Sequence, residues 1–128
     1  MKYMLMMHHK GEGPPITQWP PQDIHAHIQF MKDLNKRLVS TGEFVEAQGL
    51  AWPDQAKIVR ARKDGGAAVT DGPFPETKEF LAGFWILDVE SEARAIAIAA
   101  EASAAPGVGG ARMSIPIEVR QVLGAPEL

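Results

Sequence analysis

The sequence of 128 residues contains no cysteine. This absence excludes disulfides, thiolate nucleophiles and cysteine-ligated zinc or iron–sulfur sites, and it is typical of a reducing, cytoplasmic environment. Long apolar runs are also missing: none approaches the roughly 20 residues that a membrane helix needs. The apolar start, residues 1–7, is too short for the core of a signal peptide. We therefore expect a cytoplasmic protein with no membrane partner.

A strong charge of either sign is lacking as well. Thirteen Lys and Arg residues oppose sixteen Asp and Glu residues, which gives a net charge of -3 at pH 7. No basic block follows the pattern of a phosphate-binding surface, so we expect no nucleic-acid partner. The contents of 45% apolar and 23% charged residues are typical of a folded globular chain. The length predicts one domain over residues 1–128.

The first half of the chain predicts a buried strand, a loop and a helix. Residues 2–8 are apolar on both faces, which favours a central strand of a covered sheet. The proline-rich residues 11–21 predict a loop that lays the ring of Trp19 against the body or a partner chain. Gly42 is placed to end an amphipathic helix over residues 22–41. Its apolar stripe, with spacings of three and four, consists of Ile24, Ile28, Met31, Leu34 and Leu38.

The second half predicts mostly strands. Residues 43–50 alternate as a strand, and two short strands, 56–62 and 67–70, flank a glycine-containing hairpin turn. Residues 80–89 predict a strongly buried strand, and Ser91 follows as the N-cap of a helix. The stripe predicted to pack that helix on the sheet consists of Ala93, Ile96, Ala97 and Ala100. Pro116 places the last strand at a sheet edge or a bulge.

This order of elements predicts an α+β fold. Two helices that cross between strands of one sheet give a ferredoxin-like split βαβ arrangement with a β-hairpin insertion, and both helices lie on one face. Apolar residues of the first strand, Tyr3 or Met4, and residues of the Phe80 strand point to the other face. A second protomer is the simplest cover for such a face, so we expect a homodimer packed sheet to sheet.

Three stretches carry a resemblance to a known family. They are MKYML (residues 1–5), LNKRLVSTGEFVEAQGL (34–50) and VTDGPFPETKEFLAGFWILDV (69–89). Together they resemble the YCII-related family, in the branch often called the DGPF domain. The resemblance implies a dimeric α+β barrel. The wider superfamily includes small isomerases, lyases and cofactor-free oxygenases, and YCII relatives are suspected of enzymatic activity through a His and Asp pair.

His27 is the leading candidate for chemistry. At about 100° per residue it falls on the inward side of the first helix, whereas His25 falls on the polar side. A buried imidazole needs partners for both nitrogens, and one of them could be a ligand. We therefore predict catalytic roles for His27 as general base or acid and for Asp71 as its orienting partner. The alternative is that His27 only packs in the core.

The Asp-Gly-Pro-Phe-Pro segment has two interpretations. In the structural one, Asp71 accepts backbone hydrogen bonds in a turn and Phe74, between two prolines, is an anchor. In the functional one, the segment forms part of a site. The predicted substrate-binding residues are Trp19, Phe74, His8 and Lys78. No metal site is expected, because His8 and His9 point to opposite faces of their strand and no His-x-x-x-His spacing occurs.

Two function classes follow from these residues. The first is a cofactor-independent enzyme that transfers a proton within a small molecule, as in isomerisation or elimination, in a pocket between sheet and helices. The second is a non-enzymatic, small-molecule-binding or regulatory dimer. A cavity of a few hundred cubic ångströms with polar groups beside His27 favours the first class. The same volume filled by Met side chains favours the second.

Overall fold

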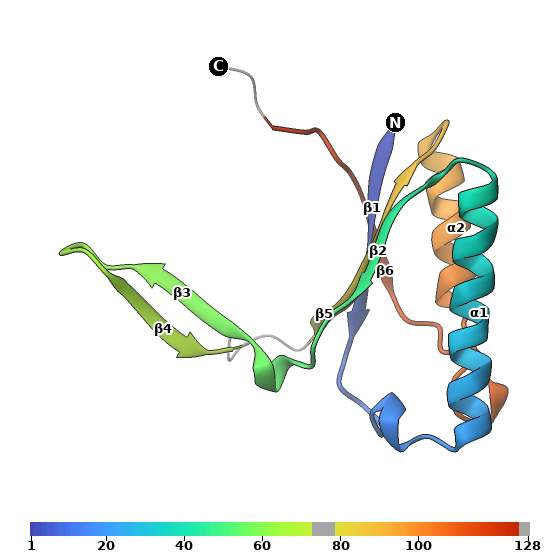
Figure 1. Ribbon diagram of the computed structural model, residues 1–128, viewed down its shortest axis with the longest axis horizontal. Coiled ribbons are helices and arrows are strands. Elements are labelled where there is room, and N and C mark those ends of the chain that lie inside the picture. Colours follow the sequence, from blue (N-terminus) through green and yellow to red (C-terminus); the bar gives the residue numbers. More distant parts are fainter. Residues whose placement is uncertain (73–78, 126–128) are drawn as a thin grey trace.

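The chain folds into two layers, a four-stranded antiparallel sheet and two helices on one of its faces (Figure 1). A computed structural model describes residues 1–72 and 79–125. Its strands and helices are β1 (Lys2–His9), α1 (Pro21–Ser40), β2 (Phe44–Gly49), β3 (Lys57–Ala61), β4 (Ala67–Asp71), β5 (Phe80–Asp88), α2 (Glu92–Ser103) and β6 (Ile117–Gln121). This architecture confirms the predicted α+β class.

The strand order of the sheet is β2-β5-β1-β6. Helix α1 connects β1 to β2 and helix α2 connects β5 to β6, so each connection passes over one strand, as in a split βαβ fold. The predicted ferredoxin-like arrangement is thus present. The central position of β1 and the edge position of β6, predicted from apolar residues and from Pro116, are also confirmed. No helix among the described residues has the length and apolarity of a membrane span.

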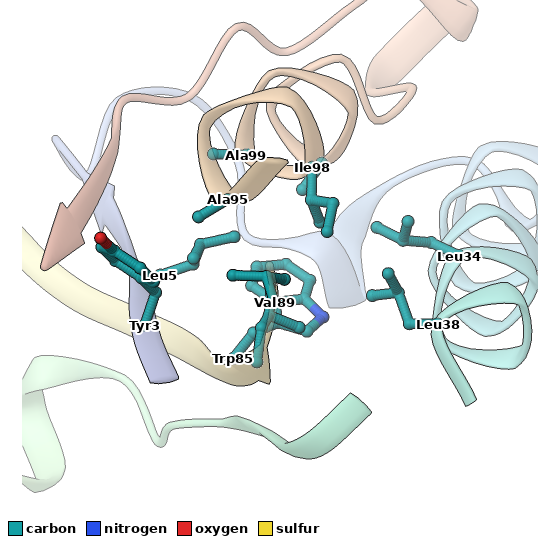
Figure 2. Close-up of a cluster of buried hydrophobic side chains, with 11 residues drawn as sticks. Tyr3, Leu5, Leu34, Leu38, Trp85, Val89, Ala95, Ile98 and Ala99 are labelled. Carbon is teal, nitrogen blue, oxygen red and sulfur yellow. The ribbon is translucent and has the colours of Figure 1, made fainter. Parts of the chain in front are cut away.

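The core lies between the sheet and the helices. Alternate residues of a strand point to the same side, so Tyr3 and Leu5 of β1 lie beside Trp85 and Leu87 of β5 on the helix-facing side (Figure 2). Burying one such side chain contributes roughly 1.5–3 kcal/mol. From the helices, the core receives Leu34, Leu38, Ala95, Ile98, Ala99 and Ala102.

The stripe predicted for α2 is wrong. Its members lie on the outward side, and Ile96 is 52% exposed. The buried side of α2 instead consists of Ala95, Ile98, Ala99 and Ala102. Because α2 carries apolar residues on almost every side, periodicity did not select the packing face. In α1 the predicted stripe holds for Leu34 and Leu38, but Ile28 is 44% exposed.

Two connections between elements have the predicted form, a loop that folds back on the body and a hairpin. The proline-rich loop folds back so that Trp19 is only 8% exposed, with its indole Nε1 donating to the Pro14 carbonyl over 3.0 Å. Strands β3 and β4 pair as a hairpin, which projects away from the sheet on the side opposite to the helices (Figure 1). Gly65 and Gly66 adopt positive φ angles in its turn.

A bidentate ion pair joins α2 to the start of β2. Arg94 Nε donates to Glu43 Oε2 over 2.8 Å and Arg94 Nη2 donates to Oε1 over 2.9 Å. Thr41 Oγ1 donates to the same carboxylate over 2.7 Å. The hydrogen bonds from Arg94, assisted by the one from Thr41, hold the pKa of Glu43 below its ordinary value of 4.5.

This lowered pKa predicts a pH-dependent contribution to stability. The ion pair stabilises the folded chain at pH values above the ordinary pKa of Glu43, and the stabilisation is lost as pH falls through the lowered value. Because Arg94 stays partly exposed, we expect Glu43→Gln to lower the free energy of unfolding by only about 1 kcal/mol at neutral pH. Urea unfolding at several pH values measures this, with the exposed Glu12→Gln as control. A difference that persists in strong acid would contradict it.

Candidate functional site

A cavity of about 430 Å³ opens between α1 and the part of the sheet formed by β2 and β5. This volume lies in the usual range of small-molecule sites. The lining comes from β1, α1, β2, β5 and the loops beside them. It consists of Met7, Ile16, His27, Met31, Asn35, Ala47, Gln48, Gly49, Leu50, Trp52, Ala82, Gly83, Phe84 and Trp85.

The helical wall of the cavity is one stripe of α1. His27, Met31 and Asn35 follow one another at spacings of four, which stacks their side chains along a single face of the helix. A polar side chain therefore lies toward each end of the wall, with a thioether between them. The two polar side chains are thus separated by about two turns of α1.

The sheet wall has room because two glycines face each other. Gly49 pairs with Gly83 in the β2–β5 ladder, next to the pair of Ala47 with Trp85, and strand alternation puts all four on the helix-facing side. A Cβ atom at Gly83 would lie 2.9 Å from the Gln48 carbonyl oxygen, so close strand approach requires glycine there. At Gly49 a Cβ atom would meet nothing within 4 Å.

The tautomer of His27 follows from its hydrogen bond. Nδ1 lies 3.0 Å from the carbonyl oxygen of Pro106, which can only accept, so Nδ1 carries the hydrogen. In the neutral ring Nε2 then holds the lone pair, and no described residue donates a hydrogen bond to it. The ring packs edge-to-face on Trp19, with centroids 5.5 Å apart. A half-buried, oriented base therefore borders the cavity.

Asn35 is oriented in a similar way. Its side-chain oxygen accepts from Trp85 Nε1 over 2.9 Å. An indole N–H can only donate, so the atom that faces it must be the oxygen and the NH₂ group points elsewhere. Among the described residues no acceptor is hydrogen-bonded to that NH₂ group. It is therefore available to a bound molecule.

Asp23 is a functional-site neighbour that the sequence interpretation missed. Only 9% exposed, its Oδ2 accepts from the backbone N–H of Gly109 over 3.1 Å. It lies one helical turn before His27, which binds the carbonyl of Pro106 in the same loop. The two side chains together fasten this loop to the start of α1. An Asp four residues before a His on an amphipathic helix was the available signal.

The predicted pairing of His27 with Asp71 is not formed. Asp71 ends β4 in the projecting hairpin, where its exposed carboxylate contacts Lys57 Nζ. The hydrogen bond from Lys57 holds the pKa of Asp71 below its ordinary value. The backbone carbonyl of Pro106 takes the place predicted for the Asp71 carboxylate.

The structure brings two of the predicted substrate-binding residues together, but outside the His27 cavity. Trp19 and His8 both line a second cavity, of about 410 Å³. Trp19 also touches the His27 ring, and His8 Nε2 lies 2.9 Å from Glu118 Oε1. Phe74 and Lys78 lie outside the described residues, so their predicted roles stay predictions. The same is true of a substrate role for Asp71.

An aromatic group that was not predicted stands beside the cavity. The ring of Trp52 lies 4.8 Å from Phe80 and 5.3 Å from His9, measured between centroids. Trp52 also lines the His27 cavity. These rings come from three separate segments of the chain, so no local sequence pattern could predict that they are in contact.

Comparison with known proteins places the chain in a family by its sequence. A search of curated proteins returns no match to this chain. The YCII-related domain matches residues 1–116, which is most of the chain and includes β1, both helices and the residues around His27. The chain belongs to the YCII-related family.

Proposed function

We propose that this protein is a cofactor-independent enzyme of the DGPF branch that transfers a proton within a small molecule, with His27 as the base. The observation that carries this proposal is the hydrogen bond from His27 Nδ1 to the Pro106 carbonyl. It leaves the lone pair on Nε2, beside a cavity of about 430 Å³. A base oriented in this way beside a ligand-sized cavity suits general acid–base catalysis.

The proposed reaction begins at a C–H bond next to a carbonyl group. Nε2 of His27 accepts the proton, and the electron pair of the broken bond moves onto the carbonyl oxygen to form an enolate. In an isomerisation, the imidazolium returns the proton to another carbon of the same molecule. In an elimination, the enolate expels a leaving group with its electron pair and the proton passes to solvent. The Pro106 carbonyl accepts from Nδ1–H throughout and so keeps the ring in one orientation.

We also propose that two copies pair through the uncovered sheet face, as a dimeric α+β barrel. Strand alternation places Met4, Met6, Phe84 and Ile86 on the face opposite to the helices. Glu118 and Arg120 of β6 lie beside this apolar strip and contact each other. A second copy of the same face brings both an apolar strip and both signs of charge, which suits a two-fold interface.

A cavity-filling variant tests whether ligand and base share this site. Gly49→Leu adds a side chain on the cavity side of β2, where no atom stands within 4 Å, so the fold should persist. We expect the wild type to gain thermal stability with members of a panel of uncharged aromatic ketones, and Gly49→Leu to gain none. Thermal-shift measurements read this directly.

The matched control adds the same side chain elsewhere. Ala93→Leu lies on the exposed side of α2, away from the cavity. It should respond to the ketones as the wild type does. Equal stabilisation of Gly49→Leu and the wild type would place the ligand outside the His27 cavity.

A further inference from the structure

We infer that the ligand of the His27 cavity is an uncharged, elongated molecule with an apolar middle and a hydrogen-bond acceptor at the end that reaches Asn35. This inference rests on the proposed function only in making the His27 end the reacting end. The charge, length and acceptor requirements follow from the lining itself.

The lining excludes a charged ligand. None of the described residues around the cavity is an Asp, Glu, Lys or Arg. Its polar side chains are His27 and Asn35, because the Gln48 side chain lies on the opposite face of the sheet, where its amide bonds Glu46 over 3.4 Å. A carboxylate or phosphate would lose its hydration here without gaining a cation, and burying an unpaired charge is costly. An uncharged molecule avoids that cost.

The two ends of the cavity set the shape of the ligand. His27 and Asn35 are eight residues apart on α1, which corresponds to about 12 Å along the helix at 1.5 Å per residue. Residues 82–85 of β5 form part of the facing wall and span about 10 Å. Met31 lies between them on α1, and Met7, which pairs with Gly83, adds a second thioether from the sheet. An elongated molecule with an apolar middle matches this sequence of surfaces.

Asn35 determines which chemical group of the ligand fits at the end of the cavity away from His27. Its oxygen is occupied by Trp85 Nε1, so its NH₂ group is what a ligand meets. A ligand that displaces water from this group without replacing the hydrogen bond loses affinity. A carbonyl oxygen is the simplest uncharged group that accepts from it. The Asn35 end therefore selects for an acceptor.

Three matched probes test the inference by calorimetric titration of the full chain. The first is para-hydroxyphenyl butanone, with a phenol at one end and a methyl ketone at the other. The second is para-butylphenol, which lacks the ketone oxygen. The third is the anion of propanoic acid with a para-hydroxyphenyl ring on its terminal carbon, which ends in a carboxylate. We expect para-butylphenol to bind about tenfold more weakly than the ketone. The carboxylate should bind about a hundredfold more weakly, or not at all.

A variant assigns the discrimination to Asn35. Asn35→Asp keeps an acceptor for Trp85 Nε1 but replaces the NH₂ group by a second oxygen. It should weaken the ketone about tenfold and remove its advantage over para-butylphenol. Asn35→Ser removes most of the amide and adds no charge. It should reduce the difference in affinity between the ketone and para-butylphenol. Retention of the full advantage in both variants would overturn the assignment.

The outcomes separate this inference from the proposed function. Failure of the ketone to bind, or tighter binding of the carboxylate, would overturn the ligand class even if His27 transfers protons. The expected ranking of the three probes would support the ligand class even if replacement of His27 left proton transfer unchanged. Probe binding needs no turnover, so the two results are independent.

Discussion

Replacement of His27 by Asn is expected to slow proton transfer by a factor of about 10² to 10⁴, the usual contribution of a positioned general base. The Asn side chain still offers an N–H to the Pro106 carbonyl, so the loop contact has a substitute, but it has no basic nitrogen. Incubation with uncharged carbonyl compounds in heavy water measures the rate. Each proton removed from carbon and replaced from solvent adds deuterium, which mass spectrometry detects.

The chain offers a matched control on the same helix. His25 lies two residues before His27 and is exposed. His25→Asn should therefore exchange deuterium at the wild-type rate. Equal rates for wild type and His27→Asn would remove His27 from the role of base. Ligand binding without any exchange in the wild type would favour the second function class, a protein that only binds its ligand.

Replacement of Ile86 by Asp is expected to convert a dimer into monomers. The residue lies at the middle of the uncovered sheet face, and its change places one carboxylate from each copy in the proposed interface. Unpaired charges buried in this way cost several kcal/mol each, so the dissociation constant should rise by a factor of at least about 10³. Analytical ultracentrifugation of the wild type should give twice the 13.9 kDa mass of one chain.

Ile96→Asp is the control for this change. It introduces the same carboxylate on the exposed side of α2, away from the sheet. This variant should remain dimeric, and both variants should keep the circular dichroism of the wild type. A monomeric wild type, or a dimeric Ile86→Asp variant with native circular dichroism, would contradict the proposed interface.

Most elements of the fold follow from local patterns in the sequence. Ser91 was predicted as an N-cap, and its Oγ accepts from the Arg94 backbone N–H over 3.2 Å. Gly42 follows the end of α1 with a positive φ, as a C-terminal glycine signal requires. Gly65 and Gly66 predicted the turn of the hairpin that β3 and β4 form. In each case one residue type satisfies a backbone requirement that its neighbours also support.

The packing face of α2 could not be predicted from local patterns in the sequence. Ala95 is buried and Ala97 is exposed, although the two residues are identical and only two positions apart. Helix α2 packs against β1 and β6, and these strands, which lie outside the helix sequence, decide which of its sides is buried. A helix that is apolar on several sides therefore leaves its orientation to tertiary contacts.

The candidate site was predictable only in part. Helical angle alone placed His27 on the inward side, whereas Gly49 and Gly83 meet through strand pairing across 34 positions of the chain. The partner of His27 was missed for a different reason. It is the backbone carbonyl of Pro106, and every residue type carries a carbonyl. The Asp71 carboxylate, which was predicted to pair with His27, instead forms an ion pair with Lys57 on the adjacent strand.

The measurement that tests the central claim most directly is the ¹⁵N spectrum of the His27 imidazole, assigned by its loss in His27→Asn. In the neutral ring, the hydrogen bond to Pro106 predicts the hydrogen on Nδ1 and a bare Nε2. Addition of para-hydroxyphenyl butanone should shift the Nε2 resonance. A neutral ring with its hydrogen on Nε2, or an Nε2 resonance unchanged at saturating ketone, would contradict a base that faces a ligand in this cavity.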